Sequence, residues 1–264
     1  MERRRLTVTA LIQARMSSSR LPGKVLADLG GQPMIGYMLG RVRRAARVDN
    51  VAVVTSTDAS DDPLAEAVAA MGGRVHRGSL DDVLDRFGTA VNEIGGDTIV
   101  RLTGDCPLID PAVIDTVIAL REQTGADYAS NVEPPSFPDG LDVECFTRAA
   151  LDRALVEATE PAMREHVTVW MRGDAGGLTR ANHAAVVDAS HLRLTVDYPD
   201  DLEVVRAIVQ QEQTAASPYD FFDLMRVLDG RRDLRETNCH ARNEGLERSL
   251  AADAAGRTGV TEQE

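Results

Sequence analysis

The chain has 264 residues, of which 43% are hydrophobic, and this is enough to bury the core of one large α/β domain. Its formal net charge of −13 disfavours a general nucleic-acid-binding protein, so no nucleic-acid partner is expected. The sequence has no long apolar run and no signal-peptide core, and its three cysteines lack paired or metal-ligand spacing. These features predict a cytoplasmic protein with no membrane partner.

The first half of the chain alternates apolar strand patterns with amphipathic helix patterns. Strands are predicted at about residues 7–13, 51–55, 74–76 and 98–102. Helices are predicted at about residues 33–44, 60–71, 80–93 and after Asp110, whose carboxylate is expected to cap that helix. This alternation is typical of a doubly wound, mostly parallel sheet. Because no G-x-G-x-x-G motif is present, a dinucleotide-binding domain is disfavoured.

The middle of the chain is less regular and predicts an insertion at about residues 127–190 that covers the sheet as a lid. Within it, the patterns predict strands at about 127–130 and 141–146 and helices at about 148–158 and 161–171. A last core strand at 192–196 and helices at 199–209 and 219–228 complete a domain of residues 1–230. Residues 231–264 form a C-terminal extension of mixed charge, which we expect to be partly disordered, above all from Ala251 onward.

A cationic, hydroxyl-rich loop follows the first predicted strand, within residues 12–24. It contains Arg15, Arg20, Lys24, serines at positions 17–19 and a Pro22-Gly23 turn. Lysine and arginine together number 29, and Lys24 is the sole lysine, so an ammonium group occurs once in a chain that otherwise uses guanidinium. Amides, hydroxyls and cations at the end of a strand can bind a polyphosphate. A solvated loop without a ligand is the alternative.

Two aspartates directly follow apolar runs that are predicted as strands. Asp105 comes after the strand at 98–102, and Asp197 after the strand at 192–196. In open α/β sheets the carboxyl ends of the strands form the ligand-binding edge, and the cationic loop leaves its strand there too. Two carboxylates beside a phosphate-binding loop predict a Mg²⁺ site. The alternative is that Asp197 only caps the helix that follows it.

Several motifs occur together in one order along the chain. They lie at residues 12–15, 18–24, 77–86, 103–107, 138–144, 164–167 and 191–197. With these motifs the chain resembles the spore-coat-polysaccharide cytidylyltransferase-like family, which is related to the enzymes that activate Kdo and sialic acid as CMP-sugars. The resemblance covers about residues 9–209. It implies a three-layer α/β/α, Rossmann-like nucleotidyltransferase fold and a homodimer.

The resemblance also implies roles for individual residues. Those expected to bind the nucleotide are Ala14, Arg15, Ser17, Arg20, Lys24, Arg77, Ser79 and Thr103, with Arg77 and Ser79 near the base. Mg²⁺ is assigned to Asp105 and Asp197, and Lys24, Arg15 and Asp105 are the expected catalytic residues. Residues expected to bind the acceptor are Asn131, Asp139, Asp142, Glu144, Arg164 and His166. The residues alone leave open that 139–144 is a solvated acidic turn and that His166 is structural.

The predicted function is Mg²⁺-dependent transfer of CMP from CTP to an acidic sugar, with release of pyrophosphate, in surface polysaccharide biosynthesis. Another nucleotide, or a phosphonate or phosphosugar acceptor, is an alternative within the same chemistry. A glycosyltransferase of related fold is disfavoured because no Asp-x-Asp motif follows a strand. A non-catalytic nucleotide-binding protein is disfavoured because Lys24, Asp105 and Asp197 are all present.

Overall fold

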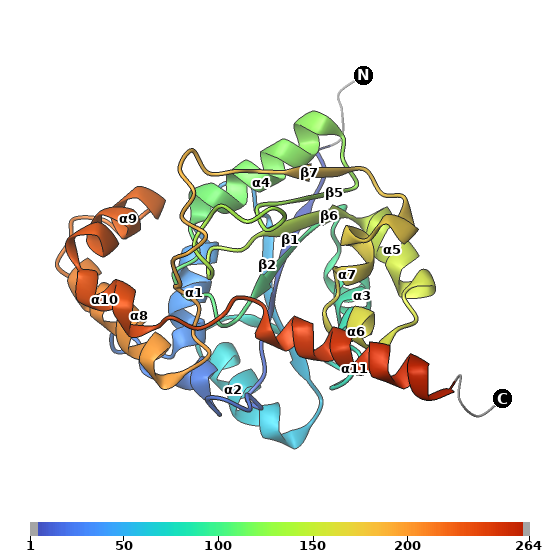
Figure 1. Cartoon of the computed structure of the whole chain (residues 1–264), viewed down its shortest axis with the longest axis horizontal. Coiled ribbons are helices and arrows are strands. Elements are labelled where there is room, and N and C mark those ends of the chain that lie inside the picture. Colours follow the sequence, from blue (N-terminus) through green and yellow to red (C-terminus); the bar gives the residue numbers. More distant parts are fainter. Residues whose placement is uncertain (1–4, 261–264) are drawn as a thin grey trace.

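The computed structural model of the chain describes residues 5–260 and contains a central sheet (Figure 1). In the described residues the sheet has seven strands in the order β3-β2-β1-β4-β6-β5-β7. The strands are β1 (Val8–Gln13), β2 (Asn50–Ser56), β3 (Arg74–Gly78), β4 (Thr98–Thr103), β5 (Tyr128–Ser130), β6 (Glu144–Thr147) and β7 (Arg180–Asn182). Only β6 runs antiparallel to its neighbours β4 and β5. The prediction of a mostly parallel α/β sheet is confirmed.

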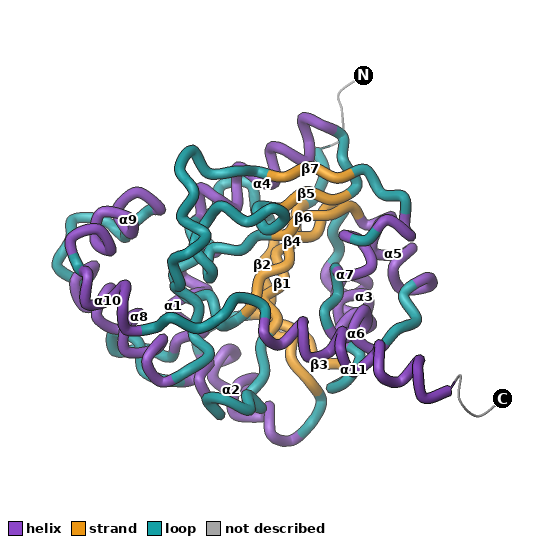
Figure 2. Tube along the Cα trace, in the orientation of Figure 1, coloured by secondary structure: helices purple, strands orange, loops and turns teal. Residues whose placement is uncertain are grey.

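Helices cover both faces of this sheet and make three layers (Figure 2). One face packs against α1 (Met34–Val42), α2 (Asp62–Ala70), α4 (Pro111–Thr124), α8 (Pro199–Glu212) and α9 (Phe221–Gly230). The other face packs against α3 (Val83–Ile94), α5 (Arg148–Glu157) and α7 (Val169–Arg172). Successive strand residues alternate between the two cores, so Ala10 and Ile12 belong to the first and Leu11 to the second. The strand period of two therefore explains why β1 is apolar throughout.

The register of the parallel strands determines which loops meet. Gln13, the last residue of β1, pairs with Thr103, the last residue of β4. Gln13 also pairs with Val54 of β2. Because β1 and β4 end at the same level, the loop after Gln13 and the residues after Thr103 emerge side by side at one sheet edge.

Helix starts follow the expected capping chemistry. The Asp110 carboxylate accepts a hydrogen bond from the amide of Ala112 at 2.8 Å, and the predicted cap of α4 is confirmed. Its second oxygen accepts from the amide of Phe221 at 2.7 Å, which also ties the start of α9 to α4. Asp110 is therefore a structural residue.

Three local predictions need correction. The segment at 127–190 is not only a cover, because β5, β6 and β7 extend the central sheet. The helix predicted at 161–171 is broken into α6 (Pro161–Glu165) and α7, because Val167 adopts a left-handed φ of 51° that no α-helix tolerates. The strand predicted at 192–196 is an extended segment with a single bridge, between Arg193 and Asp139. Its backbone is held instead by the loop residue Asp105, whose carbonyl accepts from the amide of Val196 at 2.8 Å.

The C-terminal extension is helical within the described residues. After α10 (Arg232–Thr237), α11 (Glu244–Val260) runs along α6 in front of the sheet (Figure 1). Disorder was expected from Ala251, and of this segment residues 251–260 are helical, while residues 261–264 lie outside the described residues. The Asp253 carboxylate accepts from the amide of Ala162 at 2.9 Å and anchors this part of α11. Among residues 5–260, no helix combines the length and apolarity needed to cross a membrane.

Candidate active site

The cationic loop folds back on itself immediately after β1. The carbonyl of Met16 accepts from the amides of Ser18 and Gly23 at 2.9 and 3.0 Å. Gly23 has a left-handed φ of 74°, which glycine adopts without strain. The buried carboxylate of Asp61 anchors the loop by accepting from the amide of Met16 at 2.7 Å. The chain then enters a short 3₁₀ turn, Lys24–Leu26, whose first side chain lies under the loop.

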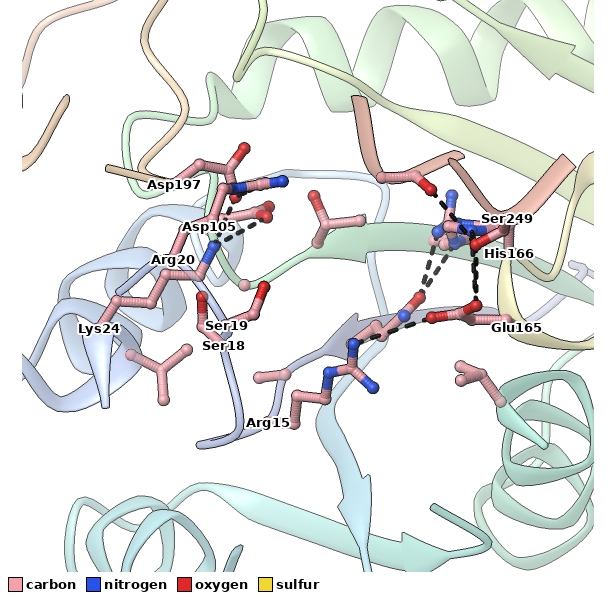
Figure 3. Close-up of a pocket in the computed structure, with 18 of the residues that line it drawn as sticks. Arg15, Ser18, Ser19, Arg20, Lys24, Asp105, Glu165, His166, Asp197 and Ser249 are labelled. Carbon is pink, nitrogen blue, oxygen red and sulfur yellow. Dashed lines mark hydrogen bonds and ion pairs between the residues drawn. The ribbon is translucent and has the colours of Figure 1, made fainter. Parts of the chain in front are cut away.

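The side chain of Lys24 joins the two aspartates that the sequence singled out (Figure 3). Its Nζ lies 2.9 Å from Asp197 Oδ1 and 3.3 Å from Asp105 Oδ2, and it donates to the carbonyl of Val196 at 2.7 Å. Burial alone would lower the pKa of Lys24, but the two carboxylates outweigh it and raise the pKa above the usual value. A permanently charged ammonium is therefore held at the sheet edge.

Asp197 is the most heavily paired acid of this cluster. Besides Lys24 it accepts from Arg20 at 2.7 Å and from Arg193 at 3.0 Å. Burial acts to raise its pKa, yet Lys24 and Arg20 lower it well below the usual range. Its carboxylate does not cap α8, because Asp201 accepts from the amides of Asp197 and Tyr198 at that helix start. The capping alternative for Asp197 is thus wrong.

Arg193 is a central residue that the sequence reasoning missed. Its buried guanidinium pairs with Asp139 at 2.8 Å, Asp197 at 3.0 Å and Asp201 at 2.9 Å. A signal for it was present: in an extended segment, residues 193 and 197 point to the same side, opposite the buried side chains of Leu194 and Val196. Arg193 therefore neutralises Asp139 as well as the neighbouring acids Asp197 and Asp201.

The cluster opens into a cavity of about 410 Å³. Its lining includes the predicted nucleotide-binding residues Ala14, Arg15, Arg20, Lys24 and Thr103, both predicted metal ligands, and the loop hydroxyls of Ser18 and Ser19. Ser17 is outside the lining, so the neighbouring serines supply the hydroxyls. Arg86, which the sequence reasoning did not select, also lines the cavity. We name this space the nucleotide cavity.

A second cavity of about 210 Å³ adjoins the first and contains most of the predicted acceptor residues. It is lined by Asp139, Asp142, Glu144 and His166 together with Arg101, Arg172 and Arg242. Arg20, Thr103, Asp105 and Asp197 line both cavities, so the Lys24 cluster stands at their junction. We name this space the acceptor cavity.

The carboxyl groups of the acceptor cavity differ in their charge state. Burial raises the pKa of Glu144, but Arg101 and Arg172 reverse this and hold it at about 2. For Asp142, burial dominates; Arg242 opposes it only in part, and Asp139 adds to it, so the pKa rises to about 7. One group is ionised at all physiological pH values, and the other changes its charge near neutrality.

Besides Ser17, four predicted site residues lie outside the linings of both cavities. Arg77 donates to the carbonyls of Ser56 and Asp58, at 2.8 and 3.0 Å, and stabilises the end of β2 and the residues after it. The hydroxyl of Ser79 accepts from the amide of Asp82 at 3.1 Å. Their place at the nucleotide cavity is taken by Arg86, which donates to the carbonyl of Ser79.

The other two are on the acceptor side. Arg164 donates to Asp82 at 2.9 Å and to the carbonyl of Leu155 at 3.0 Å, so it links α6 to α3 and α5. Asn131 is fully buried and bridges the backbone of Leu141 and Val143, with both bonds at 2.8 Å. These two residues shape the protein around the cavity. His166 does line both cavities, and its Nε2 lies 3.0 Å from Ser249 Oγ (Figure 3).

The donor set at the junction fits a divalent cation. Asp105 and Asp197 each place a carboxylate oxygen within 3.3 Å of one atom, Lys24 Nζ, so their oxygens converge. Carboxylate oxygens are the ligands that Mg²⁺ prefers. Another group, Asp200, Asp201 and His240, also brings three ligand atoms together. There Asp201 is fully buried, its carboxylate accepts from the amides of Asp197 and Tyr198 at the start of α8, and it lies outside the linings of both cavities, so that group serves the fold.

Comparison with known proteins agrees with this geometry. Residues 9–221 match the family model described as cytidylyltransferase. The chain is 35% identical over 208 residues to the spore coat polysaccharide biosynthesis protein SpsF of Bacillus subtilis, which covers 76% of this chain and 85% of the relative. It is 44% identical over 116 residues to the 3-deoxy-manno-octulosonate cytidylyltransferase of Geobacter sulfurreducens, covering 43% of this chain and 45% of that one.

A solved structure leads to the same family. The structure of a cytidylyltransferase from Leptospira borgpetersenii serovar Hardjo-bovis superposes with a TM-score of 0.83 at 30% identity. The match covers 90% of this chain and 100% of the other. The resemblance found in the sequence motifs is thereby confirmed. The chain belongs to the cytidylyltransferase family and is a nucleotidyltransferase.

Proposed function

We propose that this cytidylyltransferase transfers CMP from CTP to an acidic, sugar-like acceptor and releases pyrophosphate, in a pathway of polysaccharide biosynthesis. The observation that carries the proposal is the cluster of Lys24, Asp105 and Asp197 at the junction of the two cavities. With the α-phosphorus of CTP at this junction, the rest of the nucleotide would occupy one cavity and the acceptor would occupy the other. Such a junction is what direct group transfer requires.

The nucleotide cavity has the side chains that a triphosphate-binding site needs. Arg15, Arg20 and Lys24 line it together with the hydroxyls of Ser18 and Ser19. Arg20 and Lys24 are engaged by Asp197, so their charges are oriented before the substrate arrives. Preorganised cations bind phosphate oxygens without the reorganisation that water needs.

The reaction that fits this arrangement is an in-line displacement. A hydroxyl oxygen of the acceptor forms a bond to the α-phosphorus, the bond from that phosphorus to the oxygen of the β-phosphate breaks, and the hydroxyl proton passes to solvent. Pyrophosphate leaves with the electron pair of the broken bond. Lys24 and Arg20 stabilise the negative charge that grows on the phosphoryl oxygens, and this electrostatic term with positioning supplies most of the rate enhancement.

Mg²⁺ would be held by Asp105 and Asp197, whose oxygens converge at the junction. When bound, the ion neutralises phosphate charge and orients the phosphoryl group. Asp197 keeps a depressed pKa, so it is ionised and ready to bind a cation over the whole physiological pH range. Lys24, which the same two carboxylates hold at the junction, would supply a further positive charge for the phosphates.

The acceptor cavity contains charges of both signs, which suits a polyol with one acidic group. Arg101 and Arg172 line it and can bind a carboxylate, while Asp139 and Asp142 can accept hydrogen bonds from hydroxyls. A purely apolar acceptor would take water away from these charged groups without offering them hydrogen bonds in return, which costs binding free energy. The relatives named above act in polysaccharide and Kdo chemistry, which supports the same class.

Pyrophosphate release from each of the four nucleoside triphosphates tests the proposal, with Mg²⁺ and a panel of acidic sugars that includes 3-deoxy-manno-octulosonate. We expect release with CTP and an acidic sugar, lost on addition of a chelator and in the Asp105→Ala variant. The matched control is Asp200→Ala, because Asp200 lies outside the linings of both cavities and should keep the activity. The substrate assignment would be overturned if CTP gave no release and another nucleotide did, or if none of the acidic sugars supported release.

A further inference from the structure

The C-terminal extension contributes to both cavities although it lies beyond the residues matched by the family model, 9–221. In the acceptor cavity it supplies Arg242, Asn243, Glu244, Gly245 and Leu246. In the nucleotide cavity it supplies Gly245, Arg248 and Ser249. Figure 1 shows the chain leaving α10, crossing in front of the sheet and continuing as α11 beside α6. The extension thus forms a wall of the site.

Polar contacts hold the extension at both sides of the site. On the α8 side, Tyr198 donates its hydroxyl to Glu244 at 2.7 Å. On the α6 side, Ser249 donates to Glu165 at 3.0 Å and contacts His166, as Figure 3 shows. None of residues 244–255 is buried, so α11 is attached by these contacts and not by an apolar core.

Arg242 makes the contact that matters most for the acceptor cavity. Its guanidinium pairs with Asp142 and also donates to the carbonyl of Phe137 at 3.1 Å, so it grips both ends of the loop at 137–142. Within residues 5–260 this is the only ion pair of Asp142, whereas Asp139 in the same loop is paired by Arg193 of the domain itself. The extension therefore supplies the counter-charge for a partly buried acid of the acceptor cavity.

We infer that the C-terminal extension is part of the acceptor site, and that Arg242 is a positioning residue that holds loop 137–142 in its acceptor-binding form. The inference rests on the function proposed above. Without Arg242, the partly buried Asp142 has no counter-charge, so the loop shifts to expose it further or the carboxyl takes up a proton. Either change alters the acceptor cavity, while the nucleotide cavity, which Arg242 does not line, keeps its residues.

Steady-state kinetics of the full chain test this, with CTP and the acidic sugar of the panel that wild type uses fastest. In Arg242→Gln, which keeps a donor for Phe137 but loses the charge, we expect the acceptor KM to rise about tenfold, between the effects of breaking an exposed and a buried charge pair. The KM for CTP should change less than about twofold. Arg242→Lys should recover much of the acceptor affinity. The matched control, Arg232→Gln, removes an exposed arginine paired only within α10 and should leave both KM values unchanged.

Each outcome decides between the two proposals. A wild-type acceptor KM in Arg242→Gln would overturn the role of Arg242 and leave the proposed function intact. No release by wild type with any acidic sugar would overturn the proposed function and, with it, this inference. Calorimetric binding of CTP shows whether Arg242→Gln is folded. If it is not, the double variant R242Q/D142N, which leaves no unpaired carboxylate, takes its place, and an unchanged acceptor KM there would equally overturn the inference.

Discussion

The nucleotide cavity and the acceptor cavity are built in different ways. The side chains that we propose to bind phosphate come from one continuous loop, residues 14–24, placed by a buried strand and a shared sheet edge. The acceptor cavity is assembled from loop 137–142, strands β4 and β6, helices α6 and α7 and the C-terminal extension. One cavity depends on a local motif, and the other depends on ion pairs between distant segments.

Because of this difference, we expect substrate specificity to change more easily in the acceptor cavity than in the nucleotide cavity. A local loop keeps its geometry as long as its strand and glycine turn are intact, so the nucleotide chemistry is robust. Loop 137–142 is held by Arg193 on one side and Arg242 on the other. Replacement of a distant arginine can therefore reshape the acceptor cavity without touching the phosphate-binding residues. The following four predictions test this contrast.

Arg193→Leu should have the largest effect because Arg193 supports both cavities. Its loss leaves Asp139, Asp197 and Asp201 without their common partner. Removing one member of a buried ion cluster costs about 3–5 kcal/mol of unfolding free energy. Denaturant unfolding measures this. A loss below about 1 kcal/mol, as for a surface pair, would show that the two cavities do not share this support.

Lys24→Ala should affect catalysis more than stability. Loss of one preorganised charge donor at a phosphoryl centre costs about 2–4 kcal/mol of barrier, so kcat/KM for CTP should fall by about two orders of magnitude. Initial rates of pyrophosphate release measure it, with Ser17→Ala, outside the cavity lining, as the control. A loss below tenfold would contradict the role of Lys24.

The acceptor cavity should respond to pH near neutrality, whereas the nucleotide cavity should not. The pKa of Asp142 is raised to about 7, so its carboxylate is ionised above that pH and becomes protonated as the pH falls through it. Its pairing with Arg242 weakens on protonation, and kcat/KM for the acceptor should fall by up to about tenfold per pH unit below 7. Glu144, with a pKa of about 2, cannot produce this dependence. A profile between pH 6 and 8 that is identical in wild type and Asp142→Asn would contradict it.

Asp110→Ala should have the smallest effect and none on the chemistry. The variant removes the cap of α4 and should cost about 1 kcal/mol of unfolding free energy. Because Asp110 lies outside the linings of both cavities, kcat and both KM values should stay at the wild-type level. A large fall in kcat would contradict this, because it would show that the start of α4 affects the geometry of the active site.

The sequence predicted the parts of the site that rest on short-range patterns. The apolar run before Gln13, the glycine turn at Gly23 and the lone Lys24 all lie within one stretch, so the loop and its strand could be located. Asp105 could be placed because it follows the β4 strand, and strand ends meet at one edge. Asp197 lies at the same edge although no sheet strand precedes it, because the amide of Val196 donates to the carbonyl of Asp105. The resemblance to the family also assigned Arg77, Ser79, Arg164 and Asn131 to the site, and these four residues lie outside the linings of both cavities.

Other features have no short-range signal. Arg193 pairs with an acid 54 residues away in the chain, and Arg242 with one 100 residues away, so neither partner can be read from spacing. The extension was expected to be partly disordered because it carries no periodic apolar face. Its helix is held by polar contacts such as Asp253 to the amide of Ala162, which leave no trace in a hydropathy pattern. Long-range ion pairs are what a single sequence conceals.

We propose that a cytidylyl group passes directly from CTP in one cavity to the acceptor in the other, with its phosphorus at the junction of Lys24, Asp105 and Asp197. Phosphorus NMR of the products formed from CTP, Mg²⁺ and an acidic sugar tests it most directly. We expect pyrophosphate and a CMP phosphodiester linked to the acceptor, formed only when CTP, Mg²⁺ and the sugar are all present. Free CMP formed at the same rate with or without the sugar would mean that water is the acceptor, and would contradict it.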